Sequence, residues 1–134
     1  MAFFLLVRGG MTSPATTGLG KIGEDLACEA LERRGYAILA RRYRTRVGEI
    51  DIVARDGHTV VFVEVKARST LDCGHPAESV TAWKQRRIIT MARHYIATHR
   101  LRDTLLRFDV VSILGAAGER PTIEVFPNAF DADT

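Results

Sequence analysis

Residues 48 to 68 read GEIDIVARDGHTVVFVEVKAR, and this stretch decides the fold. Apolar and polar side chains alternate on both sides of Asp56-Gly57, a dipeptide typical of the tight turn between two antiparallel strands. Asp51, Glu64 and Lys66 interrupt the otherwise apolar runs. Because a charged group is costly to bury without a partner, these three residues need a specific explanation.

The turn predicts the register of the hairpin and the face that each side chain occupies. With Asp56 and Gly57 at its centre, position 54 pairs with 59, 52 with 61 and 51 with 62. Asp51 then lies opposite Phe62 and diagonal to Glu64. Lys66 follows one step further along the same face. The other face is uniformly apolar and suits a covering helix: Ile50, Ile52, Ala54, Val61, Val63 and Val65.

Two carboxylates on neighbouring strands indicate a metal site. Diagonal neighbours lie ~7 Å apart at the backbone, close enough for two carboxylates to share one small cation. Mg²⁺ and Mn²⁺ accept such oxygen ligands and leave positions for water and phosphate. A neighbouring lysine would assist phosphodiester hydrolysis. The alternative is a solvent-facing sheet surface on which Lys66 pairs with Glu64.

The remaining periodicity predicts a single α/β domain with a mixed sheet of four to five strands, in the order αβββαββ. The first three strands form a meander, and the fourth follows a helical crossover and lies parallel to an earlier strand. Tyr95 and Trp83 are expected in the core. Helices are predicted at 21–34 and 79–98, and strands at 36–44, 48–54, 59–67, 106–114 and 121–126.

Composition is that of one globular domain, with 134 residues, 46% hydrophobic and 26% charged. No apolar run approaches the ~20 residues that cross a bilayer, so we expect no membrane segment and a cytoplasmic location. The two cysteines and four histidines lack metal-ligand spacing, which argues against a zinc site. The domain is predicted over 18–127, after a disordered segment at 1–17 and before a flexible tail at 128–134. Met11 is an alternative start to Met1.

The charged residues of the hairpin belong to a wider pattern. An acid on the first helix, an Asp on one strand and Glu-x-Lys on the next resemble the PD-(D/E)XK nuclease superfamily, which includes archaeal Holliday-junction resolvases. Across about 18–111 the chain resembles the bacterial YraN family, but Arg42 stands where relatives commonly carry Asn. The resemblance rests on G-E-I-D-I-V-A at 48–54, V-F-V-E-V-K-A-R at 61–68, Gly74, Pro76, Lys84 and Arg107-Phe108-Asp109.

That resemblance implies a restriction-endonuclease-like fold and a set of roles. Asp51 and Glu64 would ligate Mg²⁺ or Mn²⁺, with the Val65 carbonyl as a third oxygen, and Lys66 would be the catalytic lysine. Glu24 resembles the superfamily's N-terminal acid. Its alternative is a carboxylate near a helix N-terminus, where the helix dipole favours negative charge.

Basic residues near this site are candidates for contacts with nucleic-acid phosphates. The alternative for the arginines of the first strand is an ordinary charged edge that discourages aggregation. Lys84 lies within the apolar stripe of the second helix, where it either reaches towards the acids or extends to solvent. Arg107 and Asp109 are expected to form a structural pair or to support the site. The candidates are Arg41, Arg42, Arg44, Arg46, Arg68 and Lys84.

Three functions fit these residues. The first is a metal-dependent nuclease that acts on DNA, including branched or repair intermediates. The second is a nucleic-acid-binding module without catalysis, and the third is a protein-interaction adaptor on the same fold. A homodimer is one expectation from the resolvase resemblance, although no self-complementary stripe demands it.

Overall fold

A computed structural model describes residues 18–68, 80–115 and 120–132 of the chain. The predicted disordered segment 1–17, Cys73, Gly74 and Pro76 lie outside these residues. The elements follow the predicted order. They are α1 (Gly18–Arg33), β2 (Ala37–Thr45), β3 (Gly48–Asp56), β4 (Thr59–Arg68), α2 (Ala82–Thr98), β5 (Leu105–Leu114) and β6 (Thr122–Phe130).

The five strands form one mixed sheet in the order β2-β3-β4-β5-β6. β4 and β5 are parallel, and every other neighbouring pair is antiparallel. Because α2 connects β4 to β5, it forms the predicted crossover. The architecture confirms the α/β class and the element order expected of a restriction-endonuclease-like domain. β6 runs to Phe130, four residues beyond the predicted end of the last strand.

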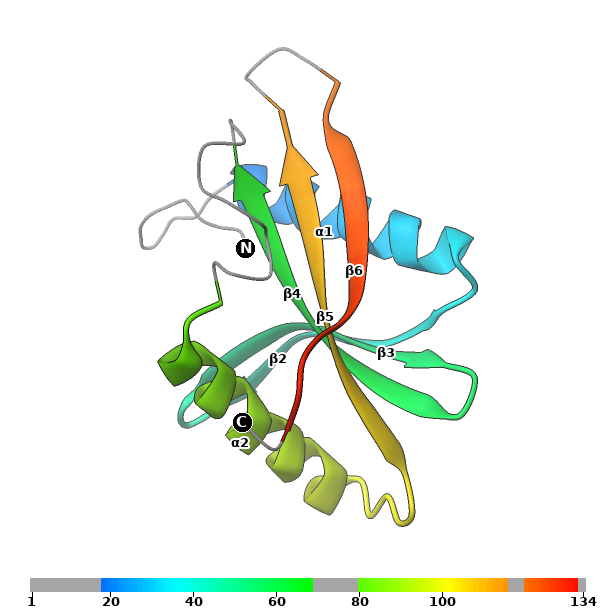
Figure 1. The fold of residues 1–134 in the computed structure, drawn as a ribbon, viewed down its shortest axis with the longest axis vertical. Coiled ribbons are helices and arrows are strands. Elements are labelled where there is room, and N and C mark those ends of the chain that lie inside the picture. The colour runs from blue at the N-terminus through cyan, green and yellow to red at the C-terminus, as the bar shows by residue number, and fades with distance from the viewer. Residues whose placement is uncertain (1–17, 69–79, 116–119, 133–134) are drawn as a thin grey trace.

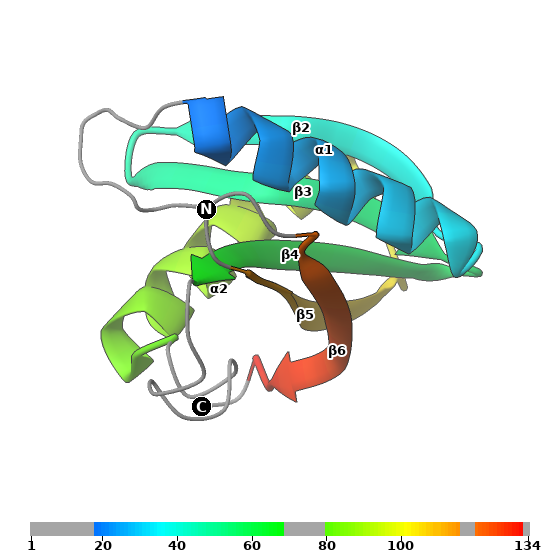
Figure 2. The same ribbon diagram turned by 90° about the horizontal axis from the view of Figure 1, so that it is seen from above.

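The two helices cover opposite faces of the twisted sheet (Figures 1 and 2). On the α1 side, Ala27, Cys28 and Leu31 pack against the valines of β4. On the α2 side, Tyr95 and its helical neighbours pack against β3, β4 and β5 around Phe62. No helix in the described residues is long and apolar enough to cross a membrane.

Trp83 corrects one core prediction, whereas Tyr95 confirms the other. Tyr95 is 5% exposed and contacts Phe62 edge-on, with ring centroids 5.7 Å apart. Trp83 is 60% exposed. The reason lies in where α2 begins. Thr81 caps the helix and accepts a hydrogen bond from the Lys84 backbone N–H at 3.2 Å, so Trp83 falls in the first turn, on the solvent side.

The hairpin register differs from the prediction by two residues. Asp56 pairs with Thr59 and Ala54 with Val61, so the turn residues are Gly57, with φ +62°, and His58. Because side chains alternate with period two, this shift leaves the faces unchanged. Ile50 is the exception: it packs in the α2-side core instead of the α1-side core. Pairing of β3 with β4 ends at Ile52, and the strand changes face at the next residue, Asp51.

Candidate functional site: carboxylates and lysines between β3, β4 and α2

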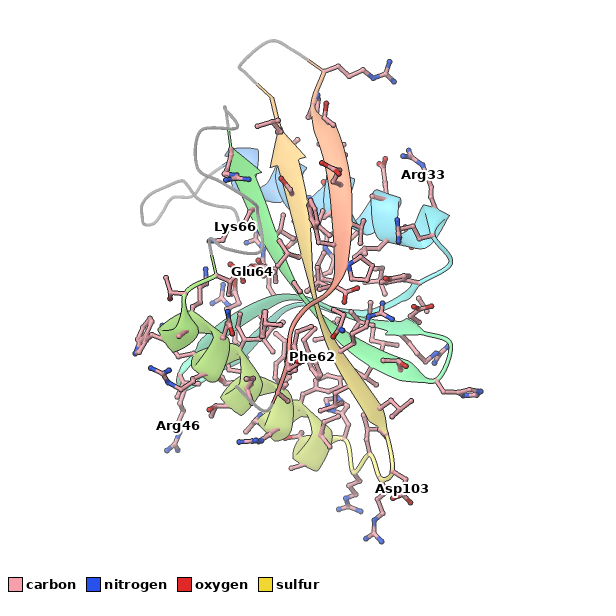
Figure 3. The ribbon with its side chains drawn as sticks, in the orientation of Figure 1. Arg33, Arg46, Phe62, Glu64, Lys66 and Asp103 are labelled. Atoms are coloured by element: carbon pink, nitrogen blue, oxygen red, sulfur yellow. The ribbon has the colours of Figure 1, made fainter. Side chains whose placement is uncertain are left out.

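Glu64 lies at the centre of a charged cluster on the α2 side of the sheet. Its neighbours Val63 and Val65 point into the α1-side core, so alternation along β4 turns Glu64 and Lys66 the other way. Figure 3 shows both side chains on β4 near the beginning of α2. Although it is charged, Glu64 is only 7% exposed.

Two ammonium groups neutralise the Glu64 carboxylate. Lys84 reaches down from the first turn of α2, and its Nζ lies 2.5 Å from Glu64 Oε2. Lys66 Nζ lies 3.5 Å from the same oxygen. The cation that the sequence placed in an apolar stripe therefore points towards the acids, which was one of its two alternatives. Pairing of Lys66 with Glu64 is also present, but in a largely buried position.

Asp51 joins this cluster from the neighbouring strand. Its Oδ2 accepts a hydrogen bond of 2.7 Å from the Val65 backbone N–H. Regular pairing of β3 with β4 ends at Ile52, one residue before Asp51, so Asp51 does not occupy the paired position opposite Phe62 that was predicted. The Asp51 carboxylate is therefore held against the β4 backbone at the residue that follows Glu64.

The pKa values of Asp51 and Glu64 shift in opposite directions. Burial, together with the charge of Glu64, raises the pKa of Asp51 to about 6. Burial also acts to raise the pKa of Glu64, but the charges of Lys84 and Lys66 outweigh it and lower that pKa to about 2. When two carboxylates share a site, repulsion makes it costly to ionise both, so the pKa of one of them is raised.

The pKa values of the two lysines also shift in opposite directions. Burial and the neighbouring charge of Lys84 lower the pKa of Lys66, although Glu64 opposes this. Lys84 is also penalised by burial, but its contact with Glu64 more than compensates and raises its pKa. Lys84 therefore stays an ammonium ion, whereas Lys66 is the amine that gives up its proton more readily.

The donor set of this cluster fits a divalent cation of the Mg²⁺ type. Two carboxylates supply the hard oxygen ligands that Mg²⁺ uses, and burial together with the charge of Glu64 raises the pKa of Asp51, so a cation beside Asp51 would stabilise its charged form. Within 18–68, 80–115 and 120–132, no group of three or more His, Cys, Asp or Glu side chains is arranged around one point. A metal ion would therefore take its other ligands from water, substrate or main-chain oxygen.

Glu24 forms ion pairs with two arginines of β2. Its carboxylate is 8% exposed and accepts hydrogen bonds from Arg41 at 2.8 and 3.1 Å and from Arg42 at 3.2 and 3.3 Å. Arg41 also pairs with Asp25. Arg42 adopts a left-handed backbone with φ +51°. Its position on β2 is opposite Asp51 in the β2–β3 register. The structure thus links Glu24 to the strand beside the site.

The other predicted phosphate contacts are in differing environments. Arg44 pairs with Glu49 at 2.9 Å on the exposed strand edge. Arg46 is exposed in the turn that follows β2, and Arg68 is partly buried at the end of β4. The basic stretch of β2 is therefore largely neutralised by carboxylates of the same domain.

The sequence did not predict all the partners of Asp109, and it gave no signal for Ser112. Arg107 and Asp109 form the predicted pair at 2.9 Å, but Asp109 also accepts hydrogen bonds from Tyr36 Oη and the Asn128 N–H. Ser112 pairs with Lys66 in the parallel β4–β5 register and is buried. A lone Ser in an apolar strand carries no motif, so only the register could reveal it.

Comparison with known proteins supports the family resemblance. The sequence model of "Uncharacterised protein family UPF0102" matches residues 23–113. A UPF0102 protein of Geobacter metallireducens is 52% identical over 113 residues, which cover 84% of this chain and 92% of that protein. Similar proteins of Chlorobium limicola and Dictyoglomus turgidum are 49% and 48% identical, over 87% and 84% of this chain and 94% and 96% of theirs. These matches confirm the predicted bacterial family.

Proposed function

We propose, for a chain that belongs to the uncharacterised protein family UPF0102, a metal-dependent nuclease activity that hydrolyses phosphodiester bonds in DNA. The proposal rests on one observation, a cluster of two carboxylates on adjacent strands and two lysines. The pKa of Asp51 is raised and that of Glu64 is lowered, while the pKa of Lys84 is raised and that of Lys66 is lowered. Opposed pKa shifts of this kind are typical of acid–base sites. We keep the cytoplasm as the proposed location.

Each residue of the cluster has a distinct proposed role. Asp51 and Glu64 would hold Mg²⁺ or Mn²⁺, and the Val65 carbonyl would be a further ligand. The bound metal ion would supply charge stabilisation of the phosphate and a more acidic water. Lys66, with its lowered pKa, would first give up its own proton to solvent and then, as a neutral amine, would accept a proton from the attacking water. Lys84 keeps its charge and would oppose the growing negative charge on the phosphate. Glu24 would position Arg42 beside Asp51 through their ion pair.

Metal binding is the first test. Calorimetric titration with MgCl₂ or MnCl₂ should show uptake by the wild-type protein near neutral pH and loss of uptake in Asp51→Asn. Glu49→Gln is the matched control, because Glu49 lies on the same strand but is exposed and paired with Arg44. Equal uptake by the wild type and Asp51→Asn would remove the proposed metal site.

Cleavage is the second test. Linear, nicked, flapped and four-way DNA are incubated with Mg²⁺ or Mn²⁺, and we expect at least one to be cut. Glu64→Gln and Lys66→Met should abolish that cutting, whereas Glu124→Gln, an exposed acid on β6, should not. Glu64→Gln is preferred to Glu64→Ala, because truncation leaves two largely buried ammonium groups without their carboxylate. Undiminished cutting by Glu64→Gln would refute the assignment.

A non-catalytic nucleic-acid-binding module is the second candidate. The contact between Lys84 and Glu64 favours it, because an internal cation already neutralises one of the two carboxylates. In that case the protein binds DNA in a salt-dependent manner, takes up no divalent metal and cuts none of the four DNA forms. The metal titration and the cleavage assay above therefore separate the candidates.

A further inference from the structure

The exposed side of α2 combines positive charge with an exposed aromatic ring. The helix sequence AWKQRRIITMARHYIAT contains no acidic residue. Arg86 and Arg93 are exposed on it, and Arg100 and Arg102 follow its end, also exposed. Arg86 and Arg93 are seven residues apart on α2, so their positions follow one line along the helix, roughly 10 Å apart. Arg100 lies beyond the end of the helix and borders the same groove as Arg93.

Within the part of the chain that the structure describes, these arginines differ from those of β2 in having no carboxylate partner. Arg41, Arg42 and Arg44 all form ion pairs with acids of the domain. Among the described residues, no ion pair joins an acid to any α2-side arginine named here. Like charges gathered without counter-ions favour a polyanionic partner. The arginines of α2 are therefore better candidates for phosphate contacts than the arginines of β2, where such contacts were expected.

The line of arginines leads into a groove. Arg93, Arg100 and Arg102 border it, and its apolar floor includes Ile96 and Leu101. Three guanidinium groups around an apolar floor suit a phosphate with its attached sugar or base, because the anion and the apolar part are each accommodated.

Trp83 lies in the first turn of α2, at the opposite end of the helix from the groove. It directly precedes Lys84, which contacts Glu64. The indole is 60% exposed, and the Arg87 guanidinium lies over the ring at 4.7 Å from its centroid. An exposed aromatic ring held by an arginine is a typical platform for an unstacked base.

We propose that the exposed side of α2 binds a nucleic-acid strand that carries an unpaired base. The base stacks on Trp83 beside the carboxylate–lysine cluster, and the phosphates follow Arg86, Arg93 and Arg100 into the groove. The choice of nucleic acid rests on the proposed function. The geometry adds the substrate class, namely DNA with a single-stranded stretch such as a flap or a junction, since a fully paired duplex offers no free base to stack.

Binding is measured in EDTA, so that no cleavage can contribute. Trp83 is the single tryptophan of the chain, so its fluorescence reports directly on stacking. Oligo-dT should quench this fluorescence, and a blunt duplex of the same length should bind more weakly and quench less. By anisotropy of a labelled oligo-dT, Trp83→Ala should weaken binding about tenfold, and Trp83→Phe should retain most of the affinity.

A charge-matched pair of triple variants tests the arginines. Changing Arg86, Arg93 and Arg100 together to Gln should lower the slope of log K against log salt by about 2 for a single strand. The control changes Arg33, Arg34 and Arg120 to Gln, removing the same formal charge from exposed positions outside α2. The control should leave the slope unchanged. An equal loss in the control, or oligo-dT binding without quenching, would overturn the proposal.

The outcomes also separate this inference from the nuclease proposal. If DNA is cut in Mg²⁺ but Trp83→Ala and the α2 triple variant bind and cut like wild type, the α2 surface is refuted and the nuclease stands. If oligo-dT binds as described but no DNA form is cut, the surface stands and the nuclease falls. Absence of any nucleic-acid binding, including a case in which only a protein partner binds, refutes the α2 surface.

Discussion

Replacing Lys84 by methionine tests the electrostatics on which the site depends. Although burial opposes it, the pKa of Glu64 is held at about 2, against 4.5 for a free glutamate, chiefly by Lys84 and then by Lys66. A difference of about two and a half units corresponds to about 3 kcal/mol. Because the folded pKa is the lower one, this stabilisation is present above pH 4.5 and disappears as the pH falls through about 2. Lys84→Met should therefore lower the free energy of unfolding near neutral pH by up to about 3 kcal/mol.

Urea unfolding in EDTA measures this change. Lys21→Met is the matched control, because Lys21 is an exposed helical lysine paired with Asp25, and exposed pairs contribute less than about 1 kcal/mol. The double variant Glu64→Gln/Lys84→Met should lose less than the sum of the two single variants, since neither charge is then left alone.

The same variant should also change the response of stability to Mg²⁺. Without Lys84, the pair of carboxylates loses its closest cation, so Mg²⁺ should bind more tightly and recover more stability in Lys84→Met than in wild type. A Lys84→Met protein within about 0.5 kcal/mol of wild type, as expected for a surface change, would refute the reasoning. So would additive single variants.

Three further predictions concern other groups. Burial and Glu64 raise the pKa of Asp51 to about 6, against 3.8 for free aspartate, so its negative charge costs the metal-free fold up to about 3 kcal/mol above that pH and nothing below 3.8. Thermal melts of Asp51→Asn in EDTA should therefore show an advantage over wild type that grows as the pH rises from 3.8 to about 6 and is constant above that pH. Asp109→Ala should cost about 3–5 kcal/mol in urea unfolding, because it removes a fully buried carboxylate that pairs with Arg107; Tyr36→Phe, which removes one hydrogen bond to that carboxylate, should cost about 1 kcal/mol. Thr81→Ala should cost about 1 kcal/mol by the same assay, since it removes the cap of α2, and a neutral result would contradict that role.

Local patterns in the chain were sufficient for most of the fold. Alternation over 48–68 predicted two strands and assigned their faces, and those faces survived a register error of two residues because the alternation has period two. The parallel fourth strand followed from the helical crossover. The position of the turn was less certain, because Gly57 can serve with either Asp56 or His58 as its partner in a two-residue loop.

The site was only partly predictable, for reasons that differ between residues. Lys84 stood out because an ammonium group in an apolar stripe needs a partner, and the partner proved to be Glu64. Trp83 was misplaced because helical periodicity does not reveal where the first turn leaves the sheet. Arg41 and Arg42 read as free cations, because their partner Glu24 lies on α1 and is distant in sequence.

Sequence by itself determined which segments are strands and helices, and it singled out Asp51, Glu64 and Lys66, because periodicity and chemical type are local properties of a chain. Only the tertiary structure decided which charges neutralise one another. It also decided that the arginines of β2 are paired with acids, whereas Arg86 and Arg93 of α2 have no acid partner among the described residues. Ion pairing depends on distances between elements far apart in sequence, and those distances exist only once the sheet and its two helices have packed.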